Sequence, residues 1–498
     1  DDQVLVMDII DYIFAFDVNF KGSELVQIMI NCIDSIGLKG VGVDELSMES
    51  TPAGSRSIKD HKIIIGKLLL ILRLLNSDLV KEESSRCILI PKAITWAVDV
   101  FLAPTDIEAT RLACSVLNAA CTALWNDGVI GKYQGDMEIC YSLAKFLPAI
   151  SRTFIKYNKF TRGNGSFKKK RVFTQLFPST YPFIEFSIDP VVNDESMVEV
   201  LVELAITFSF VARVGKEAAG NEGYITILDS RIENDFFIPE KYLASDFHGE
   251  DILTFLSGIR YMRLGKYFPE TKWYSTYSVI IEGCLCAIEL VRPLVIINQL
   301  PALDDSESFD RTLWGNYLRS LFKLAVLPPV AVEHLSDVPK SACTKITNDV
   351  RKRAAFLINE AWDSLAWDAT DEDMLRFNLK KFGGYQVEFI NDEFGILPDL
   401  MLLGLQRDSE CQSVAIKILW SIMISEYILS DTLQDVERQC LLGLHEIYHN
   451  NSYKPTSLDQ ENFIERMKMT VRLDREDEAF DIIYNFIQNL SSFFGTLN

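Results

Sequence analysis

The five residues from His445 to His449 read His-Glu-Ile-Tyr-His and match the pattern H-E-x-x-H. On an α-helix the two histidines lie one turn apart on the same face. There they can bind zinc, while the glutamate between them can activate a water molecule. A zinc-dependent peptidase is therefore one hypothesis for this chain.

The surroundings of His445 and His449 favour a different interpretation. Asn450 follows directly and predicts the end of the helix, where histidine is favourable without a metal because the last carbonyl groups carry partial negative charge. Glu461 and Glu465 lie beyond an intervening loop, so no third ligand is evident. We therefore predict no catalytic residue, no metal and no cofactor in this chain, with the zinc site as the less favoured alternative.

A second group that could do chemistry is a basic cluster in a glycine-containing loop, formed by Lys168, Lys169, Lys170 and Arg171. Such a cluster can contact the headgroups of anionic lipids, although a solvated loop is the simpler interpretation. The whole chain has 70 acidic and 49 basic residues, a formal net charge of −21. Because such a surface repels phosphate, we expect no nucleic-acid partner.

The cysteines and the apolar runs indicate where the chain functions. Its ten cysteines form no C-x-x-C pair, and Cys284 and Cys286 would point to opposite sides of a helix. A reducing, cytoplasmic compartment is expected. The apolar run from Ile63 to Leu75 is too short to cross a bilayer, and the run from Val279 to Leu300 is interrupted by charged residues, so no transmembrane segment is predicted.

The composition and the apolar spacing predict an all-α fold. Hydrophobic residues make up 48% of the 498 residues, while glycine (25) and proline (16) are too few for a protein of many hairpins. Leu112, Val116, Ala120 and Leu124 recur every four residues, which predicts a helix, and Gly128 is expected to end it.

Similar helical segments follow along the chain, separated by short polar breaks. No motif recurs with a fixed period, which is typical of an α-solenoid of armadillo- or HEAT-like repeats. A compact multi-domain helical protein is the alternative. We predict helical repeats over residues 1–160, an irregular insertion with helices over 161–250, and further repeats over 251–498. Since the chain opens on Asp1, we expect a piece of a longer protein.

Two helices carry a resemblance to a known family. Leu313–Tyr317, with the sequence Leu-Trp-Gly-Asn-Tyr, resembles the L-W-x-N-Y opening of a helix in the DOCK (dedicator of cytokinesis) proteins. Asp349–Arg353, followed by Phe356 and Trp362, is similar to that family's D-M-R-x-x-x-x-F-x-x-x-x-W helix.

Further matches keep the family's order. They are Gly395–Pro398, Ala415–Ile416 and Leu419–Tyr427, so the resemblance covers roughly residues 313 to 427, and the first 300 residues match in helical character alone. Gly315 and Trp420 depart from the pattern and suggest a divergent, fungal-type member.

The resemblance implies the fold and the role of this region. In the family, an armadillo-like helical region lies between a membrane-targeting C2-like domain and a domain that exchanges nucleotide on Rho-family GTPases. The chain would be that helical region, non-catalytic by itself, in an exchange factor whose partners are an ELMO-like adaptor and a Rho-family GTPase, with peripheral recruitment to membranes. The alternative is an unrelated HEAT or armadillo adaptor that binds a protein on its concave face.

The aromatic residues of the matched motifs are expected to be core rather than binding surface. They fall on apolar faces of the predicted helices, where large aromatic side chains are usually buried. These residues are Trp314, Tyr317, Phe356, Trp362 and Trp420.

Overall fold

The computed structural model describes most of the chain and divides it into two compact units, Asp1–Phe247 and His248–Asn498. The described residues are 22–35, 58–102, 107–126, 128–163, 194–229, 249–261, 268–301, 306–390, 395–450, 454–471 and 473–497. Within them helices dominate and strands are confined to two short hairpins, which confirms the all-α class. The division into three parts drawn from the sequence stays a prediction.

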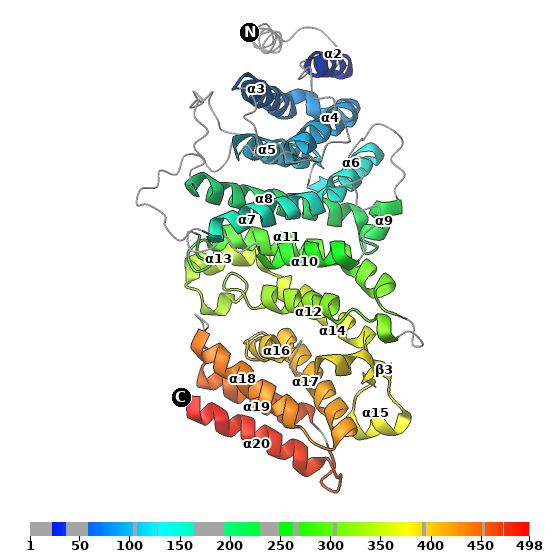
Figure 1. The fold of residues 1–498 in the computed structure, drawn as a ribbon, viewed down its shortest axis with the longest axis vertical. Helices are drawn as coiled ribbons and strands as arrows, with labels where there is room; N and C mark the ends of the chain where they lie inside the picture. Colours follow the sequence, from blue (N-terminus) through cyan, green and yellow to red (C-terminus); the bar gives the residue numbers. More distant parts are fainter. Residues whose placement is uncertain are drawn as a thin grey trace. The chain divides into compact units, whose positions relative to one another are not determined.

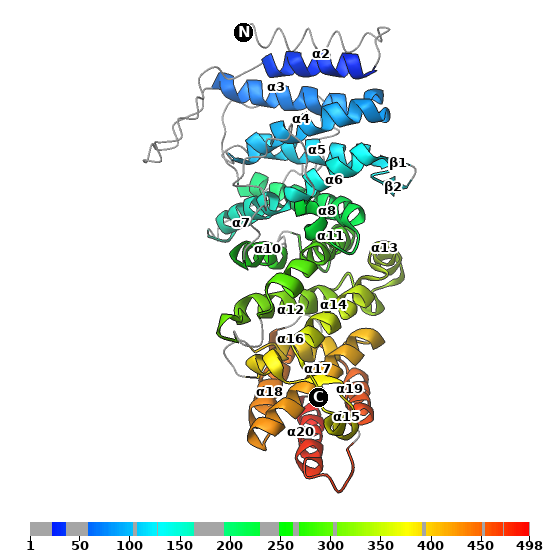
Figure 2. The same cartoon turned by 90° about the vertical axis from the view of Figure 1, so that its right-hand side faces the viewer.

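The first unit is a succession of helices (Figure 1) with one short hairpin, whose strands β1 and β2 are labelled in Figure 2. Its elements are α2 (Gly22–Ser35), α3 (Ile58–Leu75), η1 (Asp78–Lys81), α4 (Glu83–Leu102), α5 (Ile107–Ala123), β1 (Trp125–Asn126), β2 (Val129–Ile130), α6 (Gln134–Lys145), α7 (Leu147–Gly163), α8 (Asp194–Ala219) and α9 (Tyr224–Asp229).

Helices two apart in the chain pack on one another in this unit. Helix α2 packs on α4, α3 on α5, α4 on α6 and α6 on α8, while α5 and α7 both pack against α8 (Figure 2). The predicted stripe on α5 makes such contacts possible, since Leu112, Val116 and Ala120 are all buried. Each helix thus buries its apolar side against more than one neighbour.

The sequence predicted that Gly128 ends α5, and this prediction is wrong. The helix ends at Ala123, and Gly128 lies between the two strands of a hairpin, with a φ of 79° that a side chain would disfavour. Trp125 pairs with Ile130 and Asn126 with Val129 in that hairpin. The glycine therefore serves a β-turn, the other common role of glycine in the left-handed region.

The second unit has more described helices than the first and a second two-stranded hairpin. Its elements are α10 (Gly249–Tyr261), α11 (Tyr274–Pro293), η6 (Leu294–Asn298), η7 (Ser306–Ser308), α12 (Arg311–Ala325), η8 (Val332–His334), α13 (Asp337–Thr347), α14 (Val350–Ser364), β3 (Trp367–Asp368), α15 (Asp371–Phe377), β4 (Lys381–Phe382), η9 (Gly384–Phe389), α16 (Leu397–Gly404), α17 (Ser409–Ser430), α18 (Gln434–Asn450), α19 (Ser457–Thr470) and α20 (Phe480–Leu497).

Three tryptophans form the centre of this unit. Trp314 on α12, Trp362 on α14 and Trp420 on α17 are each at most 1% exposed, and α14 packs against both other helices. Each indole N–H donates a hydrogen bond: Trp314 to the carbonyl of Gln299, Trp362 to the hydroxyl of Ser421 and Trp420 to the carbonyl of Phe377, at 2.7–3.0 Å. Because the indole N–H of each of these three tryptophans has a hydrogen-bond partner, the rings bury apolar surface without leaving a polar group unsatisfied.

The prediction of a buried aromatic set is confirmed for four of its members and wrong for one. Trp314, Trp362, Trp420 and Tyr317 are buried, but Phe356 is 61% exposed. Phe356 lies two residues from Ala354 and Ile358, both buried, and therefore on the opposite side of α14.

Helix α17 is largely enclosed by its neighbours. Among the described helices it alone has the length and the apolar composition that crossing a bilayer would require, and 67% of that stretch is buried inside the fold. Its neighbours α14, α16 and α19 supply that burial. The packing therefore accounts for the apolar composition of α17, which the sequence analysis did not single out.

Candidate functional site

Helix α18, which carries the H-E-x-x-H pattern, is held by contacts on two sides. The Glu426 carboxylate at the end of α17 accepts hydrogen bonds from the backbone N–H groups of Asp435 and Val436, at 2.9 and 3.0 Å, and so caps the first turn of α18. Burial raises the pKa of the Glu426 carboxyl although both hydrogen bonds oppose that shift. On the other side, Gly443 lies so close to Pro398 of α16 that a Cβ would meet its Cα at 2.8 Å.

The two histidines of the pattern stack on one another on the exposed side of α18. Their ring centroids are 3.9 Å apart and their planes differ by 16°. The Nδ1 atom of His449 lies 3.0 Å from the backbone carbonyl oxygen of His445, and because that oxygen can only accept, Nδ1 donates. Both rings are therefore fixed by contacts within the helix itself.

This geometry does not suit a zinc ion. The lone pairs of imidazole lie in the ring plane, so two nearly parallel rings direct them side by side rather than toward one point. Catalytic zinc also needs three protein ligands. Across the described residues, no cluster of three or more His, Cys, Asp or Glu side chains could hold a metal, and Glu446, Glu461 and Glu465 are all exposed. The geometry of His445 and His449 thus counts against the peptidase hypothesis.

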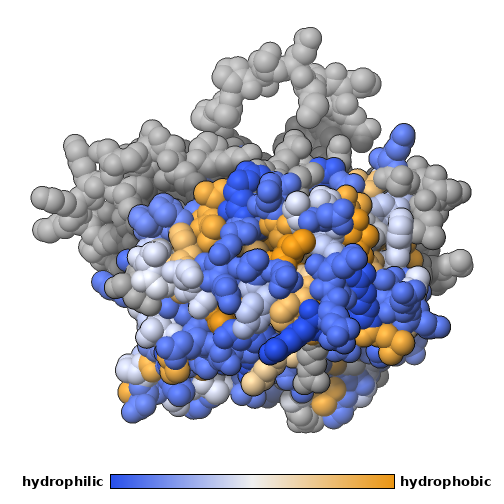
Figure 3. Space-filling view, turned by 90° about the horizontal axis from the view of Figure 1, so that it is seen from below, coloured by the Kyte–Doolittle hydropathy of each residue, from blue (hydrophilic) through white to orange (hydrophobic). Residues whose placement is uncertain are grey.

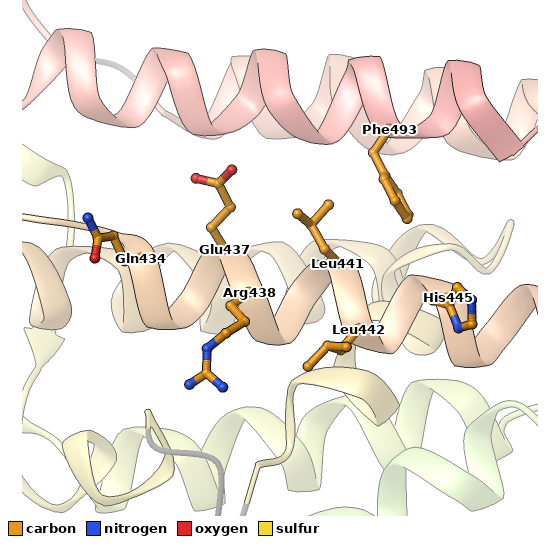
Figure 4. A pocket seen from close by; sticks show the side chains of 7 residues that line it. All are labelled: Gln434, Glu437, Arg438, Leu441, Leu442, His445 and Phe493. Atoms are coloured by element: carbon orange, nitrogen blue, oxygen red, sulfur yellow. The ribbon is translucent and has the colours of Figure 1, made fainter.

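The same helix forms one wall of an open groove of about 600 Å³. Helix α20 contributes Phe493 to the lining, and the two helices pack on each other. Figure 4 shows Glu437 and Leu441 pointing from α18 toward α20, and Phe493 pointing back from α20. The lining residues are Gln434, Glu437, Arg438, Leu441, Leu442, His445 and Phe493.

Two charged residues of the groove, Glu437 and Arg438, have partners on the helices that form it, whereas one of its leucines is largely exposed. Asn489 of α20 donates from Nδ2 to Glu437 at 3.0 Å, and Arg438 lies 3.1 Å from Asp435. Leu442, in contrast, is 56% exposed. His445 lines the groove as part of this surface, a role that its type and spacing did not indicate.

Exposed hydrophobic side chains also occur elsewhere on the surface. On the face shown in Figure 3, hydrophobic side chains lie in small groups between wider hydrophilic areas. Small apolar groups with polar surroundings are usual on protein surfaces, whereas a groove that collects several of them is a stronger sign of binding.

The basic cluster that was the other candidate from the sequence lies outside the described residues. Lys168, Lys169, Lys170 and Arg171 fall between α7 and α8, so their predicted contact with anionic lipid stays a prediction. The groove between α18 and α20 was missed because its walls are separated by about 50 residues, and α20 carries no motif.

Comparison with known proteins gives one relative. Over its full length the chain is 21% identical, across 514 aligned residues, to DOCK-like protein 1 of Saccharomyces cerevisiae, and it covers 26% of that protein. The similarity supports a DOCK-related family. No family model matches the chain, and no solved structure gives a significant match.

The alignment extends the resemblance seen in the sequence. It includes the residues before Leu313, where the sequence analysis found helical character alone. The chain spans about a quarter of its DOCK-like relative, so what the whole relative does is not thereby shown for this region.

Proposed function

We propose that the chain is a helical-repeat segment of a DOCK-type guanine-nucleotide exchange factor for Rho-family GTPases, non-catalytic by itself. Its role is to hold a membrane-targeting domain and an exchange domain in register. The observation that carries the proposal is the similarity to DOCK-like protein 1 over the whole chain. The matched tryptophans support it, because they form the core of the second unit as a scaffold would require.

The arrangement that suits this role is an armadillo- or HEAT-like α-solenoid. Within the first unit, contacts join α2 to α4, α4 to α6 and α6 to α8, and within the second they join α10 to α12, α12 to α14, α16 to α18 and α18 to α20. Contacts between alternate helices are what stacked helical pairs produce.

The proposal extends to the partners of the longer protein. We place it in the cytoplasm with an ELMO-like adaptor and a Rho-family GTPase as partners, and with recruitment to membranes aided by the basic cluster Lys168–Arg171. The exchange activity belongs to a domain outside this chain.

A nucleotide-exchange assay tests the proposal. Release of a fluorescent GDP analogue is followed from a panel of Rho-family GTPases, with this chain and with the longer protein that contains it. We expect acceleration by the longer protein for at least one GTPase and none by the chain alone. Acceleration by the chain alone would refute its scaffold role, and a longer protein that accelerates no GTPase would leave the free-standing adaptor as the better assignment.

A further inference from the structure

The groove between α18 and α20 has the dimensions of a helix-binding surface. Its lining runs along α18 from Gln434 to His445, and at 1.5 Å per residue this is about 16 Å, or three helical turns. Leu441, Leu442 and Phe493 provide apolar contacts toward the His445 end of that length, and polar residues line the other end (Figure 4). A groove of this length and character fits the apolar side of one amphipathic helix.

The charged residues beside the groove indicate which charge a bound partner helix would carry. Of the residues that line the groove, Glu437 and Arg438 are charged and offset each other. Asp435 and Glu446 are exposed and adjoin the lining residues Gln434 and His445, so this stretch of α18 carries three carboxylates against one guanidinium, a formal net charge of −2. Arg438, the single cation, already pairs with Asp435 at 3.1 Å. The surface around the apolar groove is therefore negative.

We propose that this groove binds an amphipathic helix of a partner protein, with leucine-like side chains on one face and lysine or arginine beside them. The apolar side chains of the partner would lie against Leu441, Leu442 and Phe493, and its basic side chains would face the carboxylates of α18. The proposal does not depend on the assignment to an exchange factor, because it rests on the geometry and charge of α18 and α20 alone.

Leu442 is the residue at which binding and folding are best separated. It lines the groove and is 56% exposed, so a polar side chain there leaves the core intact. Leu458 on α19 offers a matched control, since it is 55% exposed and does not line the groove. Leu442→Asp and Leu458→Asp add the same charge to the same protein. A difference in peptide binding between the two variants therefore shows whether the peptide contacts the groove.

The test uses the full chain and a labelled model peptide of about 14 residues, or four helical turns. In this peptide leucines recur at i, i+3, i+4 and i+7 and lysines fill the other positions. A second peptide has the same composition in scrambled order, so that its leucines share no face. Fluorescence anisotropy measures binding at low salt and at about 0.3 M salt, where exposed charges are largely screened.

We expect the amphipathic peptide to bind the chain and Leu458→Asp equally, and to bind Leu442→Asp about tenfold more weakly. The scrambled peptide should bind weakly to all three proteins. Hydrogen exchange should show protection of α18 and α20 in the complex. Circular dichroism checks that both variants fold.

A second pair of variants tests the charge requirement without touching the apolar residues. Asp435→Lys and Glu446→Lys replace exposed carboxylates of α18 and should weaken binding at low salt more than at high salt. Equal binding by the scrambled peptide, or equal binding by Leu442→Asp and Leu458→Asp, would overturn the proposal. So would self-association of the chain that Leu442→Asp abolishes, because the groove would then be an interface between copies.

Discussion

The two units bury different large side chains, although each contains a buried arginine: in the second unit Arg351 pairs with Glu333 at 3.0 Å. The second unit buries Trp314, Trp362 and Trp420, each with one hydrogen bond from its indole. The first unit joins its helices through buried arginines: Arg86 of α4 pairs with Asp136 of α6, and Arg111 of α5 pairs with Glu203 of α8. Tryptophan carries no charge into the core, whereas an arginine must find a carboxylate there.

The two arginine pairs also differ from each other. Arg86 and Asp136 are fully buried, and Arg86 donates two hydrogen bonds to Asp136, at 2.8 and 2.9 Å, and two more to backbone carbonyls. Arg111 contacts the carboxylates of both Glu199 and Glu203, and the Oε2 atom of Glu203 is buried without a hydrogen-bond partner. The Arg86–Asp136 pair has one carboxylate for one guanidinium and both are hydrogen-bonded. Arg111, in contrast, faces two carboxylates, one more than its single charge can neutralise. The comparison predicts that the stability of the first unit depends on pH through the Glu203 carboxyl, whose pKa burial raises.

The largest effect is expected from Trp362→Ala, which removes the central indole of the second unit. Loss of its buried surface and of the hydrogen bond to Ser421 should cost about 3–5 kcal/mol of unfolding free energy. Urea denaturation measures the cost. Trp367→Ala is the control, because that ring is 60% exposed. An unchanged midpoint for Trp362→Ala would contradict a core role.

Asp136→Ala tests the satisfied ion pair of the first unit. The substitution leaves the Arg86 guanidinium buried without its carboxylate, and breaking such a pair costs about 3–5 kcal/mol. Denaturation followed by circular dichroism measures it. Asp78→Ala, which removes the exposed partner of Lys81, is expected to change little. If both variants unfold like the parent, the pair contributes nothing.

Glu203→Gln tests the excess carboxylate through pH. Burial raises the pKa of Glu203 from 4.5 to about 7, although Arg111 opposes the shift. A raised carboxyl pKa means that the folded state binds the proton more tightly. This contribution to stability is therefore complete below pH 4.5 and is lost as pH rises through about 7. It should amount to on the order of 2 kcal/mol.

The measurement for Glu203→Gln is the unfolding free energy from pH 5 to pH 8 in both proteins. The parent should lose stability relative to the variant as pH rises, since glutamine does not titrate. Parallel curves would show that Glu203 is ionised throughout and that Arg111 outweighs its burial.

The smallest effect is expected from Phe356→Ala. Because its ring is 61% exposed, truncation should change the unfolding free energy by no more than about 0.5 kcal/mol. Phe356 and Trp362 lie six residues apart on the same helix, so the two alanine variants measure how strongly side-chain position on α14 decides stability. A cost for Phe356→Ala close to that for Trp362→Ala would show that the ring is covered in solution.

The sequence predicted the features that depend on neighbouring residues. The spacing of Leu112, Val116 and Ala120 placed them on one buried face of α5, and the motifs of the resemblance include Trp314 and Trp362, which proved to be core. The helix was also predicted to end after His449, and α18 ends at Asn450. Helical periodicity is local, since residues three or four apart share a face whatever surrounds the helix.

The sequence could not predict which charges are buried or where a groove opens. Arg86 and Asp136 are 50 residues apart and Arg111 and Glu203 are 92 apart, and each would be taken for surface by its type. Phe356 and Trp362 are both large aromatic residues on one helix, and the sequence predicted that both are buried. The helices that pack against α14 bury Trp362 and leave Phe356 exposed.

What the sequence by itself determined is a chain of amphipathic helices with a DOCK-like order of motifs. Only the tertiary structure decided that His445 and His449 stack on the surface and that an open, partly apolar groove lies along α18 beside α20. The physical reason is distance along the chain. A helix forms from contacts within a few residues, whereas a site forms from side chains that packing brings together from far apart.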